Sequence, residues 1–64
     1  MNTQHEFLKV LEVAEELRIA RSRAYEMVAN GTIPAVKIGR SVRVSRKELE
    51  GWLEEQRYLN AAQQ

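Results

Sequence analysis

The spacing of the apolar residues changes at Pro34, and this change limits the chain to a small set of folds. Before Pro34 the apolar residues recur at helical intervals, first at Val10, Val13, Ala14 and Leu17. After it they alternate with polar residues, as they do in a β-strand. Because the 64 residues allow one domain with one modest core, the sequence predicts a small α+β domain that is mostly helical.

Two short amphipathic helices are predicted ahead of Pro34. Residues 18–20 separate them, a connection short enough for a helix-turn-helix. The second helix ends at Asn30-Gly31, since both residues tolerate the left-handed backbone that closes a helix. Its apolar residues are Ala24, Met27 and Val28. Many helical hairpins share this form, so the chain after Pro34 decides between them.

The alternation after Pro34 predicts a two-stranded β-hairpin. Gly39 supplies the backbone freedom that a tight turn needs, which places Arg40 near the tip. We expect one apolar inner face and one basic outer face. The inner face consists of Val36, Ile38, Val42 and Val44, and the outer face carries Lys37 and Arg43.

A third helix is predicted directly after the hairpin. Ser45 and Glu48 have the spacing of a capping box. Leu49, Trp52 and Leu53 form the buried stripe, which assigns Trp52 to the core and not to a ligand site. The helix is expected to run to about residue 59. The chain therefore divides into a flexible tail at 1–6, a winged helix-turn-helix at 7–59 and a flexible tail at 60–64.

The net charge of +1 conceals a separation of charge along the chain. From residue 18 to residue 47, eight basic residues stand against Glu26 alone, a net charge of +7, and the remainder carries −6. Such a cationic block is the electrostatic footprint of phosphate-backbone binding. A solvated charged surface is the alternative interpretation.

Five stretches follow one another in an order typical of one family. They are FLKVLEVA (7–14), ARSRAY (20–25), IPAVKIGR (33–40), VRV (42–44) and LEGWL (49–53). In this order they resemble the excisionase-type helix-turn-helix family, which is related to the DNA-binding half of MerR regulators. The resemblance covers about residues 7–53, and the IPAVKIGR stretch is its most specific part.

The resemblance implies a winged domain that binds double-stranded DNA. Members are commonly phage or mobile-element excisionases, which bend attachment-site DNA and recruit an integrase. Others are small transcription regulators of the same elements. For an excisionase we expect cooperative self-association on neighbouring DNA repeats. A protein-interaction module that has lost DNA binding is a third interpretation.

Four positions depart from the family pattern. Lys9 replaces the usual helix-capping Thr, Arg18 stands where Gly is common in the turn, and Ala20 stands where Ser or Thr usually caps the second helix. The missing cap weakens that helix start by roughly 1 kcal/mol. Glu26 occupies a surface position that often holds a basic or polar residue. Arg18, Ala20 and Glu26 are the departures that keep the protein-interaction interpretation open.

On this architecture the predicted DNA-binding residues lie on the second helix and on the hairpin. The helix set, expected in the major groove, is Arg21, Ser22, Arg23, Tyr25 and Glu26. The hairpin set, expected on adjacent backbone or in an adjacent minor groove, is Lys37, Arg40, Ser41 and Arg43. A wing that makes no DNA contact is the competing view.

Individual roles follow from side-chain chemistry. Arg23 is the first candidate for base contact, because a guanidinium binds O6 and N7 of guanine through two parallel hydrogen bonds. Arg21 and Ser22 are assigned to phosphates. Tyr25 either contacts a phosphate or packs against the hairpin. Glu26 either accepts a hydrogen bond from a cytosine amino group or repels phosphate.

Catalysis and metal binding have no support in the sequence. Cysteine and aspartate are absent, and the single histidine, His5, lies in the polar N-terminal stretch. We therefore expect a protein that is not an enzyme and has no metal or other cofactor. The apolar runs are too short for a signal peptide or a membrane span, so we expect a cytoplasmic protein with no membrane partner.

Overall fold

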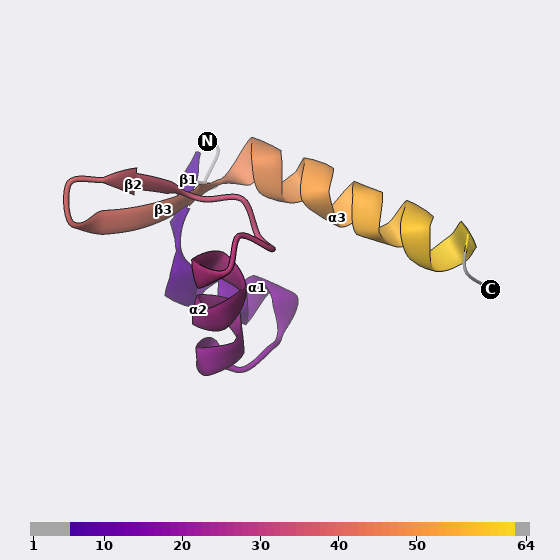
Figure 1. Cartoon of the computed structure of the whole chain (residues 1–64), viewed down its shortest axis with the longest axis horizontal. Helices are drawn as coiled ribbons and strands as arrows, with labels where there is room; N and C mark the ends of the chain where they lie inside the picture. Colours follow the sequence, from indigo (N-terminus) through magenta and orange to yellow (C-terminus); the bar gives the residue numbers. More distant parts are fainter. Residues whose placement is uncertain (1–5, 63–64) are drawn as a thin grey trace, which may run out of the picture.

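The computed structural model describes residues 6–62, and its six elements form a winged helix-turn-helix (Figure 1). In chain order they are β1 (Phe7–Lys9), α1 (Val10–Leu17), α2 (Arg21–Ala29), β2 (Val36–Ile38), β3 (Ser41–Ser45) and α3 (Arg46–Ala62). The predicted fold class is confirmed, with its two helices, hairpin and third helix in the expected order. The strand β1 is an addition that the apolar pattern did not indicate.

β1 extends the hairpin to a three-stranded antiparallel sheet in the order β1-β3-β2. Phe7 pairs with Ser45, and Lys9 pairs with Arg43. Between these pairs, Leu8 points into the core and is 2% exposed. The start of the domain is therefore held by the end of the hairpin.

The hairpin faces differ from the predicted ones. Its two-residue turn pairs Ile38 with Ser41, and residues directly opposite one another in an antiparallel pair share a face. Val36 and Ile38 consequently lie on the face opposite to that of Val42 and Val44, and they are 40% and 57% exposed. The prediction of a single apolar inner face is wrong, because a shift of one residue in register moves a whole strand to the other face.

The core joins α1, α2, the sheet and the start of α3. Its larger cluster consists of Leu8, Val13, Ile33, Val44 and Leu49, and a smaller one consists of Val10, Ala14 and Ala24. Trp52 and Leu53 pack against the larger cluster, which confirms the assignment of Trp52 to the core. Leu8 and Ile33 are core residues that the periodic pattern missed.

α1 begins and ends at residues that depart from the family pattern. The Lys9 side chain makes no cap; instead the Lys9 amide donates a hydrogen bond to Glu12 Oε1 at 2.8 Å. Arg18, which follows α1, adopts the left-handed conformation with φ 57° and ψ 45°. Ala20 leaves α2 without a side-chain cap. The helix-turn-helix forms despite all three departures.

α2 ends at Asn30 and Gly31, as predicted. Gly31 has a φ of +84°, in the left-handed region. Asn30 Oδ1 accepts hydrogen bonds from the amide and the hydroxyl of Thr32, at 2.9 and 2.6 Å. The Ile33 amide then donates to the Met27 carbonyl at 3.1 Å, which brings the Ile33 side chain back into the core.

α3 leaves the domain in the direction opposite to the hairpin wing (Figure 1). The Glu48 amide donates to Ser45 Oγ at 3.4 Å, the first bond of the predicted capping box. The helix continues to Ala62, beyond the predicted end near residue 59, so residues 60–62 are helical where a tail was expected. Tyr58 and Leu59 are exposed on this distal part.

The predicted N-terminal tail at 1–6 lies outside the described residues except for Glu6, as do residues 63–64 of the predicted C-terminal tail. The Glu6 carbonyl accepts a hydrogen bond from the Arg46 amide at 2.8 Å. Within residues 6–62, no helix has the length and apolar character needed to cross a membrane.

Candidate nucleic-acid interface

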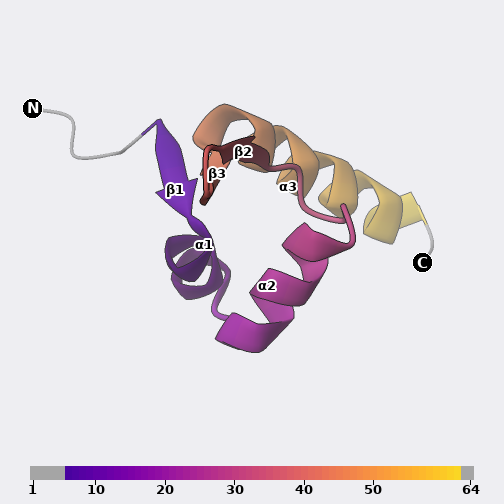
Figure 2. The same cartoon turned by 60° about the vertical axis from the view of Figure 1, so that its left-hand side comes forward.

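α2 packs through one side and leaves the other uncovered (Figure 2). The packed side consists of Ala24, which is fully buried, with Met27 and Val28 half-buried. All five side chains predicted to enter the major groove are exposed, namely Arg21, Ser22, Arg23, Tyr25 and Glu26. The apolar stripe of α2 thus orients the predicted set outward.

The two arginines of α2 lie on opposite flanks of its exposed side. Successive residues turn by about 100° around a helix, which places Ser22 and Glu26 near the middle of this side, between Arg21 and Arg23. Arg23 Nη1 donates to Glu26 Oε1 at 3.1 Å. Both side chains are 63% exposed, so water screens this pair and it contributes at most about 1 kcal/mol. Arg23 is therefore oriented by Glu26 but easily released.

The hairpin wing carries basic residues on both of its faces. Lys37 pairs with Val42 and so lies on the face that is continuous with the core. Arg43 pairs with Val36 and lies on the opposite face. The prediction that Lys37 and Arg43 share one outer face is wrong, and the cause is the same register that exposes Val36.

The tip of the wing is built on Gly39, whose φ is +64°. A positive φ at the first turn residue, followed by an ordinary φ at Arg40, matches a type II′ turn, the kind that suits the twist of a hairpin. Arg40 and Ser41 are exposed beside it. Among residues 6–62, no hydrogen-bond or ion-pair partner holds the Arg40 guanidinium.

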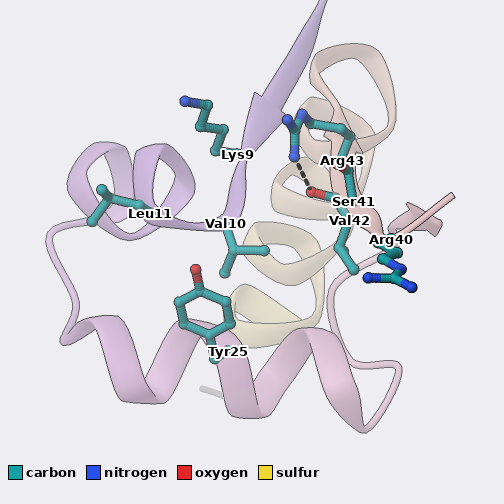
Figure 3. A pocket seen from close by; sticks show the side chains of 8 residues that line it. All are labelled: Lys9, Val10, Leu11, Tyr25, Arg40, Ser41, Val42 and Arg43. Carbon is teal, nitrogen blue, oxygen red and sulfur yellow. Dashed lines mark hydrogen bonds between the residues drawn. The ribbon is translucent and has the colours of Figure 1, made fainter. Parts of the chain in front are cut away.

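A hollow of about 400 Å³ lies between the wing, the start of α1 and the exposed side of α2 (Figure 3). It is lined by Lys9, Val10, Leu11, Tyr25, Arg40, Ser41, Val42 and Arg43. Four of the nine predicted site residues therefore meet there, one from α2 and three from the wing. The other five, Arg21, Ser22, Arg23, Glu26 and Lys37, do not line it.

Lys9 is a basic residue that lines the hollow but was not predicted from the sequence as a site residue. The sequence presents it only as a poor helix cap, and a basic residue directly before an amphipathic helix is the single signal that could have drawn attention to it. Its position beside Arg43 depends on the pairing of β1 with β3. That pairing joins segments far apart in the chain.

One member of the cationic block is used to hold the fold. Arg46 Nη2 and Nη1 donate to the Glu16 carboxylate at 2.7 and 3.3 Å, linking the start of α3 to the last turn of α1. The hydrogen bond to Glu16 raises the pKa of Arg46 above its ordinary value, and desolvation acts in the opposite direction. The positive charge of Arg46 is therefore committed to a protein contact.

Within the part of the chain that the structure describes, no three carboxylate, histidine or cysteine side chains gather as they would around a metal ion. Nor does any described side-chain polar atom lie buried without a hydrogen-bond partner. The polar groups available to a ligand are those of the exposed surface, and the basic ones gather on α2, the wing and the hollow between them.

A family model described as a helix-turn-helix domain matches residues 7–57. Two proteins from two strains of Mycobacterium tuberculosis, each named provisionally as a DNA-binding protein, are 43% identical to this chain over 49 residues. The matched segment covers 77% of this chain and 63% of each relative, so the chain spans less than two thirds of their length. No solved structure matches the chain significantly.

Proposed function

The chain belongs to the helix-turn-helix domain family, and we propose that it binds a specific double-stranded DNA sequence through α2 and the hairpin wing. The observation that carries this proposal is the division of α2 into a packed apolar side and an uncovered side whose first turn holds Arg21, Ser22 and Arg23. The provisional names of the two mycobacterial relatives agree with it. We propose that the protein acts by binding alone, without a catalytic step.

In the proposed complex α2 lies in the major groove. Its two flanks then face opposite walls of the groove. Arg21 binds a phosphate from one flank, and Ser22, next to it in the first turn and nearer the middle of the exposed side, is also assigned to a phosphate. Arg23 leaves Glu26 to bind the O6 and N7 edge of a guanine, a contact worth about 1–3 kcal/mol of discrimination between bases. Glu26, near the middle of the exposed side, faces the bases directly and either accepts from a cytosine amino group or acts by repulsion.

The wing provides the second contact in this proposal. Lys37 lies on the same face of the sheet as the half-buried Val42 and the core residue Val44, and so on the side of α1 and α2. Arg40 and Ser41 extend from the tip toward the neighbouring backbone or minor groove. Contacts of this kind add affinity and bending without reading base edges.

For the biological role we propose an excisionase that acts in the cytoplasm, binds neighbouring sites side by side, bends attachment-site DNA and recruits an integrase. Tyr58 and Leu59 support this role, because they leave exposed apolar surface on α3 for a protein contact while α2 is occupied by DNA. A stand-alone transcription regulator of a mobile element is the alternative on the same DNA-binding surface.

Selection from a random duplex library at moderate salt tests the DNA-binding proposal and distinguishes an excisionase from a transcription regulator. Tandem sites in one orientation, about one helical turn apart, are expected for an excisionase that binds cooperatively. An inverted repeat would favour a symmetric dimeric regulator. No enrichment of any sequence would overturn specific DNA binding and favour a protein-interaction module.

The salt dependence of the affinity provides an independent check. A protein that neutralises about five phosphates should show a slope of roughly −4.5 when the logarithm of the association constant is plotted against that of the salt concentration. A flat response would contradict the proposed binding mode. The same plot then measures the contribution of each basic side chain.

A further inference from the structure

The hollow beside the wing combines a concentration of positive charge with space for a ligand group. Three basic side chains line it, Lys9 from β1, Arg40 from the turn and Arg43 from β3 (Figure 3). No carboxylate is among its lining residues within the described part of the chain. Its volume of about 400 Å³ equals that of roughly a dozen liquid water molecules. A small anionic group and its immediate substituents therefore fit inside.

The charges in the hollow are not neutralised by the protein. Arg43 Nη1 donates to the carbonyl of Val42 at 2.9 Å, which fixes the guanidinium but leaves its charge in place. The Lys9 ammonium and the Arg40 guanidinium have no ion-pair or hydrogen-bond partner among residues 6–62. Lys9 and Arg43 pair across β1 and β3, so their like charges lie on the same face of the sheet, and an anion bound between them relieves their repulsion.

The remaining lining residues restrict the kind of anion. The hydroxyls of Tyr25 and Ser41 supply neutral hydrogen-bond donors, and the side chains of Val10, Leu11 and Val42 form apolar wall. An anion with apolar substituents, such as a phosphate flanked by two deoxyriboses, matches donors and apolar wall together.

We propose that this hollow binds one phosphodiester of the DNA backbone, at the point where the strand passes from the groove occupied by α2 to the wing. The inference rests on the proposed DNA binding, because it takes the course of the strand from it. Lys9 is the principal contact, and the Tyr25 hydroxyl donates a hydrogen bond to the same phosphate. Of the two roles expected for Tyr25, the proposal takes phosphate contact and not packing against the hairpin. Arg43, which pairs with Lys9 across β1 and β3, adds positive charge beside it, whereas Arg40 lies apart from both near the turn (Figure 3).

The first experiment measures the salt dependence of DNA binding for Lys9→Ala and Lys9→Gln against wild type. Each variant should lower the magnitude of the salt slope by about 0.9 and weaken binding about fivefold at 0.1 M salt, because one phosphate contact is lost. Lys47→Ala is the matched control, since Lys47 is also exposed, lies on α3 and does not line the hollow. It should leave the slope unchanged.

The second experiment replaces single phosphates of the selected site by neutral methylphosphonates. At one position per bound protein, the replacement should weaken wild-type binding about fivefold and leave Lys9→Ala binding unchanged, because the two changes remove the same contact. Equal weakening of both proteins at every position would overturn the assignment of Lys9 to a phosphate.

A third measurement separates the DNA backbone from free phosphate as the source of the anion. Inorganic phosphate is titrated against the protein at constant ionic strength while the amide signals of Lys9, Tyr25 and Arg40 are followed by NMR. Small shifts with no saturation, together with the methylphosphonate effect, support the backbone phosphodiester. Saturation at millimolar phosphate without a methylphosphonate effect would instead assign the hollow to a free anion and overturn the proposal.

The outcomes distinguish this inference from the function on which it rests. A steep salt dependence in wild type, with the same slope in Lys9→Ala and Lys47→Ala, would overturn the proposal that the hollow binds a backbone phosphate and would leave DNA binding intact. A flat salt response in wild type would overturn both.

Discussion

Arginine serves two different purposes in the two halves of this molecule. On the side of α1 and α3, Arg46 is bound to Glu16 and Arg57 to Glu54, at 2.7 and 3.2 Å. Around the wing, Arg40 has no carboxylate partner among the described residues, and Arg43 bonds only to a carbonyl. The Arg46 pair joins α3 to α1 and the Arg57 pair stays within α3, whereas positive charge left without a counterion remains available to a polyanion.

α2 carries one arginine of each kind. Arg21 has no acidic partner among residues 6–62, but Arg23 is paired with Glu26 in the same i, i+3 arrangement that joins Arg57 to Glu54. Contact geometry alone does not distinguish these two pairs. Their positions do, because one lies on the uncovered side of the helix-turn-helix and the other on the distal part of α3. The chain thus contains its own control for the role of Arg23.

The largest effect on DNA affinity is expected from Arg23→Ala. Loss of a bidentate guanine contact should weaken binding to the selected site by about 1–3 kcal/mol, which is roughly fivefold to 150-fold, and should relax specificity at one base pair. Arg57→Ala removes an arginine from an equivalent exposed pair and should leave the affinity unchanged. Equal losses in both variants, measured by fluorescence anisotropy, would remove the distinction between the two halves.

Arg40→Ala should have a smaller effect that does not depend on DNA sequence. Because Arg40 is assigned to the backbone, its loss should reduce affinity about fivefold on selected and random duplexes alike, and should lower the salt slope by about 0.9. Arg40→Lys keeps a point charge at the tip and should restore most of the slope. A loss confined to the selected site would instead assign Arg40 to base contact.

Arg18→Gly should increase stability and leave the salt slope unaltered. A residue with a side chain costs about 1–2 kcal/mol in the left-handed conformation that Arg18 adopts, and glycine avoids most of that cost. The greater freedom of glycine in the unfolded chain offsets part of the gain, so about 1 kcal/mol and a rise of roughly 4–8 °C in Tm are expected. Calorimetry measures the rise in Tm. A reduced salt slope would place Arg18 on the DNA instead.

The elements that could be predicted are those whose pattern is local. α1 and α2 each contain two turns of apolar stripe, and the stripe of α2 at Ala24, Met27 and Val28 also determines which residues face outward. The exposure of the residues predicted to bind DNA on α2 therefore followed from the sequence. The start of α3 followed for a similar reason, since Ser45 and Glu48 lie within one turn.

What escaped prediction depends on register between segments distant in the chain. A strand of three residues, Phe7–Lys9, is too short to show alternation, and it is defined by its pairing with β3. The faces of the hairpin depend on which residue of β2 meets which residue of β3, and the alternation within each strand does not contain that information. The hollow, with Lys9 beside Arg43, needs both pairings, so no local pattern could indicate it.

Glu26→Gln should have the smallest effect, and its sign decides between the two roles of Glu26. If Glu26 only holds Arg23 in the free protein, release of Arg23 costs about 0.2–0.5 kcal/mol, and the substitution should tighten binding to any duplex by about twofold. If Glu26 accepts from a cytosine amino group, the same substitution should weaken binding to the selected site and leave random duplexes nearly unaffected. Glu54→Gln breaks the matching pair on α3 and should change neither affinity. Because Arg23 and Glu26 lie within one turn of α2, a weakening that disappears in the Arg23→Ala background would show that the two side chains bind DNA as one unit.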